Sequence, residues 1–206
     1  ERLDLLFDEG SFVEVGKFIA HRSTSFGMAK VDAPGDGVIT GYGSVDGRAV
    51  FAAIQDESVL KGAVGIAHAQ KISKCVDMAV KTGSPFVFLI NTAGARISEG
   101  LDALKGYGKI IKSLSRAIGE IPTISVITGK CVGAASIIAS MTDFSVMSGD
   151  SYFAFSGQDS LASTTLSDVK KVCDSNGVSK TGRVTLTASN RAECFAKVKE
   201  LLCYLP

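Results

Sequence analysis

The fold is decided by residues 86–100, which read FVFLINTAGARISEG. Five apolar residues, 86–90, give way to a turn of small residues, and a charged segment that suits a helix follows. This order predicts a buried strand ending in a turn whose backbone can approach a ligand closely. The pattern returns at residues 123–136, TISVITGKCVGAAS. Two such turns at two strand ends could point two backbone N–H groups at one oxygen, which stabilises a developing oxyanion.

Small residues at both turns meet the steric requirement of that chemistry. A thioester that loses a proton from its α-carbon becomes an enolate, whose charged oxygen accepts hydrogen bonds from nearby N–H donors. The pairs Gly94-Ala95 and Gly133-Ala134 leave the backbone open to such an oxygen. The second pair also opens a predicted helix, where free N–H groups and the helix dipole favour negative charge. Close packing of a helix on a strand would equally explain small residues, and is the alternative.

Alternating strand and helix patterns along the rest of the chain indicate an α/β fold. Asp46-Gly47, between two apolar runs, is a strong signal for a β-hairpin. Ser189 or Asn190 is expected to cap a terminal helix that carries an apolar stripe. The predicted strands cover residues 37–43, 49–55, 86–90, 123–128, 144–147 and 152–155. The predicted helices lie within residues 1–12 and at 63–80, 101–118, 134–140 and 167–173.

Several blocks, in a common order, give the chain a specific resemblance to a known family. The blocks are ERLDLLFDEGSF at 1–12, HRST at 21–24, PGDGVITGYG at 34–43, GIAHAQKI at 65–72 and the two turns. They resemble the N-terminal lobe of the biotin-dependent acyl-CoA carboxyltransferases. That family includes the carboxyltransferases of propionyl-CoA and acetyl-CoA carboxylases and the sodium-pumping decarboxylases. The resemblance ends near residue 155.

The resemblance selects one architecture and one chemistry. The order of strands and helices alone fits a doubly wound sheet equally well, whereas the family has the crotonase-like (ClpP/crotonase) spiral of ββα units. The resemblance implies a single domain of the N-terminal carboxyltransferase type over residues 1–206. It also implies carboxyl transfer between carboxybiotin, held on a separate carrier protein, and a coenzyme A thioester through an enolate.

The resemblance also implies where the oxyanion donors lie. It places them at the N–H groups of Ala95 and Gly133, with Ala134 as the alternative second donor and Gly94 shaping the first turn. The implied mechanism needs no side-chain acid or base from this chain. Consistently, neither Ser98 nor Ser136 has an adjacent base that the sequence can identify.

Basic residues near the turns are candidates for contacts with CoA or carboxybiotin. Arg96 either holds a phosphate or carboxylate as a bidentate fork or pairs internally with Glu99. His21 and Arg22 lie in a loop that resembles the family's approach to the active site.

Four further residues have both a structural and a functional interpretation. Lys61 and Lys105 flank predicted helices, where they either meet CoA phosphates or lie in solvent. His68 falls within a predicted helix, and a packed or capping role is favoured over catalysis. Asp36, between two glycines, is interpreted as part of a plain tight turn.

Composition excludes several classes of protein. The 206 residues include 22 basic and 21 acidic side chains, without the blocks of like charge that nucleic-acid partners require. Five scattered cysteines form no Cys-x-x-Cys pair, so neither a metal site nor a disulfide framework is predicted. No apolar run reaches the roughly 20 residues that span a bilayer. A cytoplasmic location is expected, or an organelle matrix if a leader has been removed.

The resemblance implies partners as well. Family members build the active site between this lobe and a C-terminal carboxyltransferase lobe of another protomer. They also work with a biotinyl carrier protein and with biotin carboxylase or decarboxylase membrane subunits. We therefore expect a homo-oligomer that binds acyl-CoA and is inactive as a single lobe. Residues 156–186 diverge from the family, so the acyl group is not predicted. The alternatives are an enoyl-CoA hydratase or isomerase and a non-catalytic acyl-CoA-binding or structural subunit.

Overall fold

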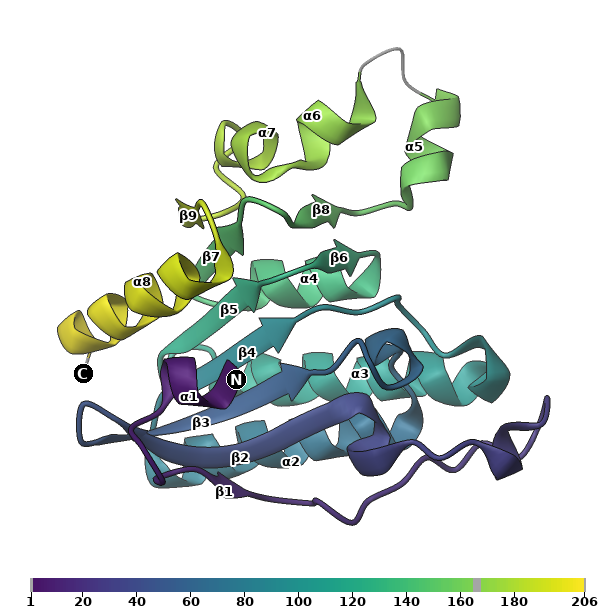
Figure 1. Cartoon of the computed structure of the whole chain (residues 1–206), viewed down its shortest axis with the longest axis horizontal. Coiled ribbons are helices and arrows are strands. Elements are labelled where there is room, and N and C mark those ends of the chain that lie inside the picture. The colour runs from purple at the N-terminus through teal and green to yellow at the C-terminus, as the bar shows by residue number, and fades with distance from the viewer. Residues whose placement is uncertain (1, 165–167, 206) are drawn as a thin grey trace.

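A computed structural model describes residues 2–164 and 168–205. A seven-stranded sheet has the order β1-β2-β3-β4-β5-β7-β9, and a separate two-stranded sheet pairs β6 with β8 (Figure 1). The strands are β1 (Val13–Glu14), β2 (Val38–Val45), β3 (Arg48–Gln55), β4 (Phe86–Ile90), β5 (Thr123–Ile127), β6 (Lys130–Val132), β7 (Phe144–Ser148), β8 (Tyr152–Ala154) and β9 (Leu186–Ala188). The helices are α1 (Arg2–Leu6), α2 (Ile66–Thr82), α3 (Leu101–Ala117), α4 (Ala134–Met141), α5 (Gln158–Thr164), α6 (Val169–Cys173), α7 (Ser175–Ser179) and α8 (Arg191–Tyr204).

Strand direction divides the large sheet into two parts. Strands β2 and β3 form the predicted antiparallel hairpin, in which Asp46 and Gly47 adopt φ values of 50° and 77°. From β3 through β4, β5 and β7 to β9, every neighbouring pair is parallel. The carboxyl ends of these strands therefore meet at one edge of the sheet, which is where ligands bind in open α/β sheets.

The chain repeats one unit as it crosses the sheet. Strand β5 lies in the large sheet, β6 in the small one, and α4 follows. The same order returns with β7, β8 and α5. Because β6 and β8 run parallel to each other, both units have the same sense. This is the ββα spiral that the resemblance implied.

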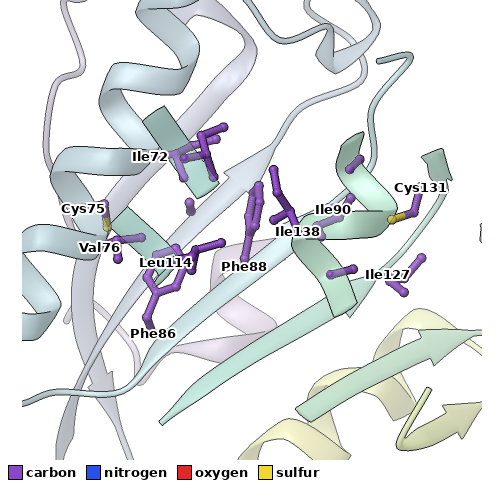
Figure 2. Close-up of a cluster of buried hydrophobic side chains, with 14 of the residues drawn as sticks. Ile72, Cys75, Val76, Phe86, Phe88, Ile90, Leu114, Ile127, Cys131 and Ile138 are labelled. Carbon is purple, nitrogen blue, oxygen red and sulfur yellow. The ribbon is translucent and has the colours of Figure 1, made fainter. Parts of the chain in front are cut away.

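Helices cover both faces of the large sheet. In Figure 1, α1 and α8 lie in front of it and α2, α3 and α4 lie behind. Side chains of strand β4 pack against helices on both faces of the sheet, because successive side chains of a strand point to opposite faces. Phe86, Phe88 and Ile90 join the cluster under α2, α3 and α4, which Figure 2 shows. Val87 and Leu89 join the cluster under α1 and α8.

The terminal helix packs on its own chain. Asn190 is its cap, because the side-chain oxygen accepts a hydrogen bond from the N–H of Glu193 at 2.9 Å. Four members of the predicted apolar stripe are buried in the second core cluster, and Leu201 packs against it. They are Cys194, Phe195, Val198 and Leu202. The stripe is therefore covered without a partner chain.

Several predicted boundaries were wrong for identifiable reasons. Helix α2 begins at Ile66 instead of residue 63, because Lys61 and Gly62 have positive φ and Val64 forms a β-bridge with Ala95. Residues 130–132 were expected to be a turn but form β6. Strand β9 and helix α7 were not predicted. The helix predicted at 167–173 is α6, which begins one residue after position 168; residue 167 lies outside the described residues.

Candidate functional site

The two turns lie side by side at the carboxyl edge of the sheet. Ile90 at the end of β4 pairs with Ile127 at the end of β5. Beyond the strands, the N–H of Thr92 donates to the carbonyl of Lys130 at 3.0 Å. The N–H of Lys130 in turn donates to Oδ1 of Asn91 at 3.2 Å. The contact between the turns is therefore maintained past the last paired strand residues.

The first turn presents an open N–H group. Val64 donates its N–H to the carbonyl of Gly94 at 2.8 Å and accepts from the N–H of Arg96 at 2.9 Å. The N–H of Ala95, between these two, has no backbone acceptor among residues 2–164 and 168–205. Ala95 is exposed and Gly94 has a φ of 100°, which favours glycine. Thr92 closes the turn, because its Oγ1 accepts from the N–H of Gly94 at 3.0 Å.

The second turn presents its open donor one residue later than preferred in the sequence analysis. The N–H of Gly133 donates to the carbonyl of Ala154 in β8 at 3.2 Å. Ala134 begins helix α4, and its N–H has no backbone acceptor within the described part of the chain. Gly133 has φ 61° and ψ −127°, a conformation that residues with a Cβ rarely adopt. Ala134, the alternative donor in the sequence analysis, is thus the one whose hydrogen remains available.

Arg96 is committed to internal partners. Its Nη1 lies 2.5 Å from Oδ1 of Asp36 and 2.9 Å from Oε1 of Glu99, and its Nη2 donates to the carbonyl of Ala63 at 2.7 Å. The residue is 4% exposed. Of the two roles weighed for Arg96, the internal pair with Glu99 is the one that the structure has. The guanidinium is therefore held by two carboxylates and one backbone carbonyl of its own chain.

His68 is a buried structural residue. Its Nδ1–H donates to the carbonyl of Asp36 at 2.8 Å, and Nε2 accepts from Nε2 of Gln55 at 3.2 Å. Burial lowers the pKa of His68 to about 3, so the ring is neutral at pH 7. Burial raises the pKa of Asp36, while the neighbouring Arg96 opposes that rise. The packed role predicted for His68 matches these contacts.

Two clefts adjoin the turns. One, of about 350 Å³, brings Arg22 together with Lys105 and Lys109, opposite Glu99 and Asp102. Its remaining lining residues are Ser23, Thr24, Ser25, Ile66, Gln70 and Ser98. Three cations at one cleft suit a phosphorylated ligand.

The second cleft, of about 440 Å³, lies at the strand ends and includes Lys61, Thr92 and Ala93. Its remaining lining residues are Glu57, Asn91, Gly129, Lys130, Asp150, Tyr152 and Arg191. His21 lines neither of these two clefts; its Nε2 lies 2.9 Å from the carbonyl of Val31, within the loop that carries Arg22.

Three buried polar residues of this region were missed as site residues. Asp36 was interpreted as a plain turn, and Gln55 and Asn91 received no role. The signal available for each was a polar residue next to an apolar strand or between two glycines. Among the described residues, no group of three or more His, Cys, Asp or Glu side chains has a geometry that could hold a metal. No described helix is both long enough and apolar enough to cross a bilayer.

Known proteins resemble this chain over its whole length. The carboxyl transferase domain model matches residues 1–206. The methylmalonyl-CoA decarboxylase subunit alpha of Veillonella parvula is 43% identical over 212 residues, which cover 100% of this chain and 41% of the relative. The mitochondrial propionyl-CoA carboxylase beta chain of Homo sapiens is 40% identical over 214 residues, which cover 100% of this chain and 39% of that one.

A solved structure shows the same fold. The transcarboxylase 12S crystal structure, a hexamer with methylmalonyl-CoA and methylmalonic acid bound, matches with a TM-score of 0.96 and 37% identity. The match covers 100% of this chain and 41% of that one. The chain thus spans less than half the length of these relatives. Its fold is crotonase-like, as expected, and the chain belongs to the carboxyl transferase domain family.

Proposed function

We propose that this chain is the acyl-CoA-binding lobe of a biotin-dependent enzyme that moves a carboxyl group between carboxybiotin and an acyl-CoA. One observation carries the proposal: two adjacent strand-end turns each expose an N–H without a backbone acceptor among the described residues, at Ala95 and Ala134. The two relatives, subunits of a methylmalonyl-CoA decarboxylase and of a propionyl-CoA carboxylase, fit that chemistry.

The two N–H groups would stabilise the enolate of the thioester. When the α-carbon loses its proton, negative charge develops on the thioester oxygen, and preorganised donors lower the energy of that state. The N–H of Ala134 also lies at the start of the eight-residue helix α4, where the dipole favours an anion. Gly94 and Gly133 keep both turns free of side chains that would block the approach. Carboxybiotin, presented by a separate carrier protein, would supply the carboxyl group as CO₂, and the ureido nitrogen freed by that loss would take the α-proton.

The cleft of about 350 Å³, which three cations line, would hold the phosphorylated end of the acyl-CoA. Arg22, Lys105 and Lys109 meet there, and none of them has a salt bridge within the described residues. His21 would act indirectly, by holding the loop that carries Arg22 through its contact with Val31. Arg96 has no such role because its guanidinium is already paired.

A second lobe would complete the site. We propose that a C-terminal carboxyltransferase lobe completes it and that the assembly is a hexamer, as the matched transcarboxylase is. The biotin side would then lie largely on the partner lobe.

The test is carboxyl transfer by the assembled enzyme with Gly133→Ala in this chain. The added methyl is incompatible with φ 61° and ψ −127°, so Ala134 should turn away and kcat should fall about 10²- to 10³-fold. Gly108→Ala is the matched control, because its Cβ meets nothing within 4 Å. Calorimetry should show that propionyl-CoA still binds to both variants.

Three results would count against the proposal. A Gly133→Ala enzyme with wild-type rate would show that the second donor is misplaced. Absence of binding heat from any CoA ester with the assembled wild-type enzyme would contradict the proposed acyl-CoA site. Hydration of an enoyl-CoA without carboxyl transfer would favour the hydratase alternative.

A further inference from the structure

A continuous series of buried polar contacts connects the two turns. It runs through Arg96, Asp36, His68, Gln55 and Asn91 and ends at the N–H of Lys130; we call it the buried polar chain. Backbone groups take part in it, because the Asp36–His68 contacts each use one backbone atom and Gln55 accepts from the backbone N–H of Asn91. The five side chains come from segments up to 60 residues apart in sequence, yet each is at most 4% exposed. The mechanism proposed above uses none of them to touch a substrate.

The first part of the buried polar chain anchors the turn that carries Ala95. Arg96 follows Ala95 directly, and its guanidinium is held between the carboxylates of Asp36 and Glu99. Oε2 of Glu99 also accepts from the N–H of Ile66 at 2.7 Å, which ties the turn to the start of α2. Oδ2 of Asp36 accepts from the N–H of His68 in the same helix at 2.7 Å.

The middle part has only one possible direction of hydrogen bonding. His68 donates from Nδ1 to the carbonyl of Asp36, so Nε2 of the neutral ring is an acceptor. Gln55 must therefore turn its NH₂ group toward His68. Its Oε1 then faces β4 and accepts from the N–H of Asn91 at 3.1 Å. A rotation of any one group would place two donors or two acceptors together.

The last part anchors the second turn. Asn91 accepts from the N–H of Lys130 through Oδ1, and its Nδ2 donates to Oε2 of Glu57. Lys130 begins β6, which leads directly to Gly133 and Ala134. Gly129 leaves the space that Asn91 needs, because a Cβ there would lie 2.2 Å from Oδ1 of Asn91.

Burying these groups costs stability that apolar side chains of similar volume would not lose. The fold has an extensive apolar core on the same face of the sheet, so the polar groups are not needed to fill it. What they add is direction, because hydrogen bonds define angles that apolar contacts leave free.

We propose that Asp36 and Asn91 are positioning residues that act through the buried polar chain to hold the two turns at the separation and orientation that one oxyanion requires. This inference rests on the proposed function. Asp36 acts on the N–H of Ala95 through Arg96, and Asn91 acts on the N–H of Ala134 through β6.

The experiment breaks the buried polar chain at each end in the assembled enzyme. Asp36→Asn removes the negative charge that holds Arg96 and hardly changes the volume of the side chain. Gly129→Ala displaces the side chain of Asn91, although the substituted residue lies outside the buried polar chain. Gly129 has no positive φ that an alanine would strain. The control is Asp143→Asn. Its Oδ2 accepts from the N–H of Thr123 at 2.8 Å at the opposite end of β5, so it tests a lost strand contact remote from the turns.

Each of the two test variants should lower kcat at least about tenfold, because small misplacements of reacting groups cost that much or more. KM and the calorimetric Kd for acyl-CoA should stay within about threefold. The double variant should lose less than the product of the single losses, since both changes disable one device. Asp143→Asn should lower Tm and leave kcat unchanged.

Hydrogen exchange gives a readout that does not depend on turnover. Asp36→Asn should speed exchange in residues 129–136, although the substitution lies at the other end of the buried polar chain. Gly129→Ala should speed exchange in residues 92–99, and Asp143→Asn should alter neither segment. The inference would be overturned if the loss of kcat in the double variant equalled the product of the two single losses. It would also be overturned if each substitution accelerated exchange only in its own turn. Wild-type activity with unaffected variants would refute the inference alone, whereas a wild-type assembly without carboxyl transfer would refute the proposed function as well.

Discussion

Acid is expected to destabilise this chain through a single buried histidine. His68 is fully buried and its pKa is about 3 in the fold, against 6.5 for an ordinary histidine. Below pH 6.5 the unfolded chain therefore binds a proton at His68 that the folded chain does not bind. The contribution of the neutral His68 to the free energy of unfolding is complete above pH 6.5 and is lost as the pH falls toward 3. The loss approaches 1.36 kcal/mol per pH unit, which gives about 2 kcal/mol at pH 5 and about 4 kcal/mol at pH 3.

The charged groups that face His68 make comparison with a variant necessary. Burial raises the pKa of Asp36, and the resulting pH dependence runs in the opposite direction. Arg96 and Lys71 both lower the pKa of His68. A comparison with His68→Asn isolates the imidazole, because the variant retains Asp36, Arg96 and Lys71.

Urea unfolding at pH 7, 6 and 5 measures the prediction. The wild type should lose about 2 kcal/mol more than His68→Asn between pH 7 and pH 5. His21→Asn removes the other imidazole of the chain and should retain the acid-dependent loss. Parallel pH dependences for the wild type and His68→Asn would refute a buried, neutral His68.

Three further outcomes are expected. Phe88→Ala should cost about 3–5 kcal/mol in urea unfolding, because Phe88 is 2% exposed at the centre of the cluster in Figure 2; a loss below 1 kcal/mol would contradict that packing. Asn190→Ala should cost about 1 kcal/mol by removing the cap of α8, whereas Ser115→Ala, at an exposed position inside α3, should not. Sedimentation at micromolar concentration should show a trimer or larger ring, or a hexamer with the partner lobe, and a monomer with full carboxyl transfer would overturn the shared site.

Local patterns predicted those elements whose contacts are themselves local. Strand β4 coincides with its predicted range, since five apolar residues between turn signals fit a strand buried on both faces. The hairpin at Asp46-Gly47 and helix α3 follow equally from short-range chemistry. Strand β6 was missed because three residues carry no periodicity, and its partner β8 comes later in the chain.

Long-range contacts explain what the sequence did not reveal about the site. The choice between Gly133 and Ala134 depends on the carbonyl of Ala154, which occupies the N–H of Gly133. Asp36 resembled a turn residue because nothing nearby indicates that its carboxylate faces Arg96. The positions of both turns were predictable, whereas the atoms that remain available within them were not.

The two candidate donors are connected to sheets of unequal size. Ala95 is bridged to Val64 beside the seven-stranded sheet, while Gly133 is tied to β8 of a sheet of only two strands. That small sheet rests on the third core cluster, where Ala154 packs with Val169 and Cys173 of α6. Substitutions in α6 and β8 should therefore displace Ala134 through its neighbour Gly133 and leave the scaffold beneath Ala95 intact.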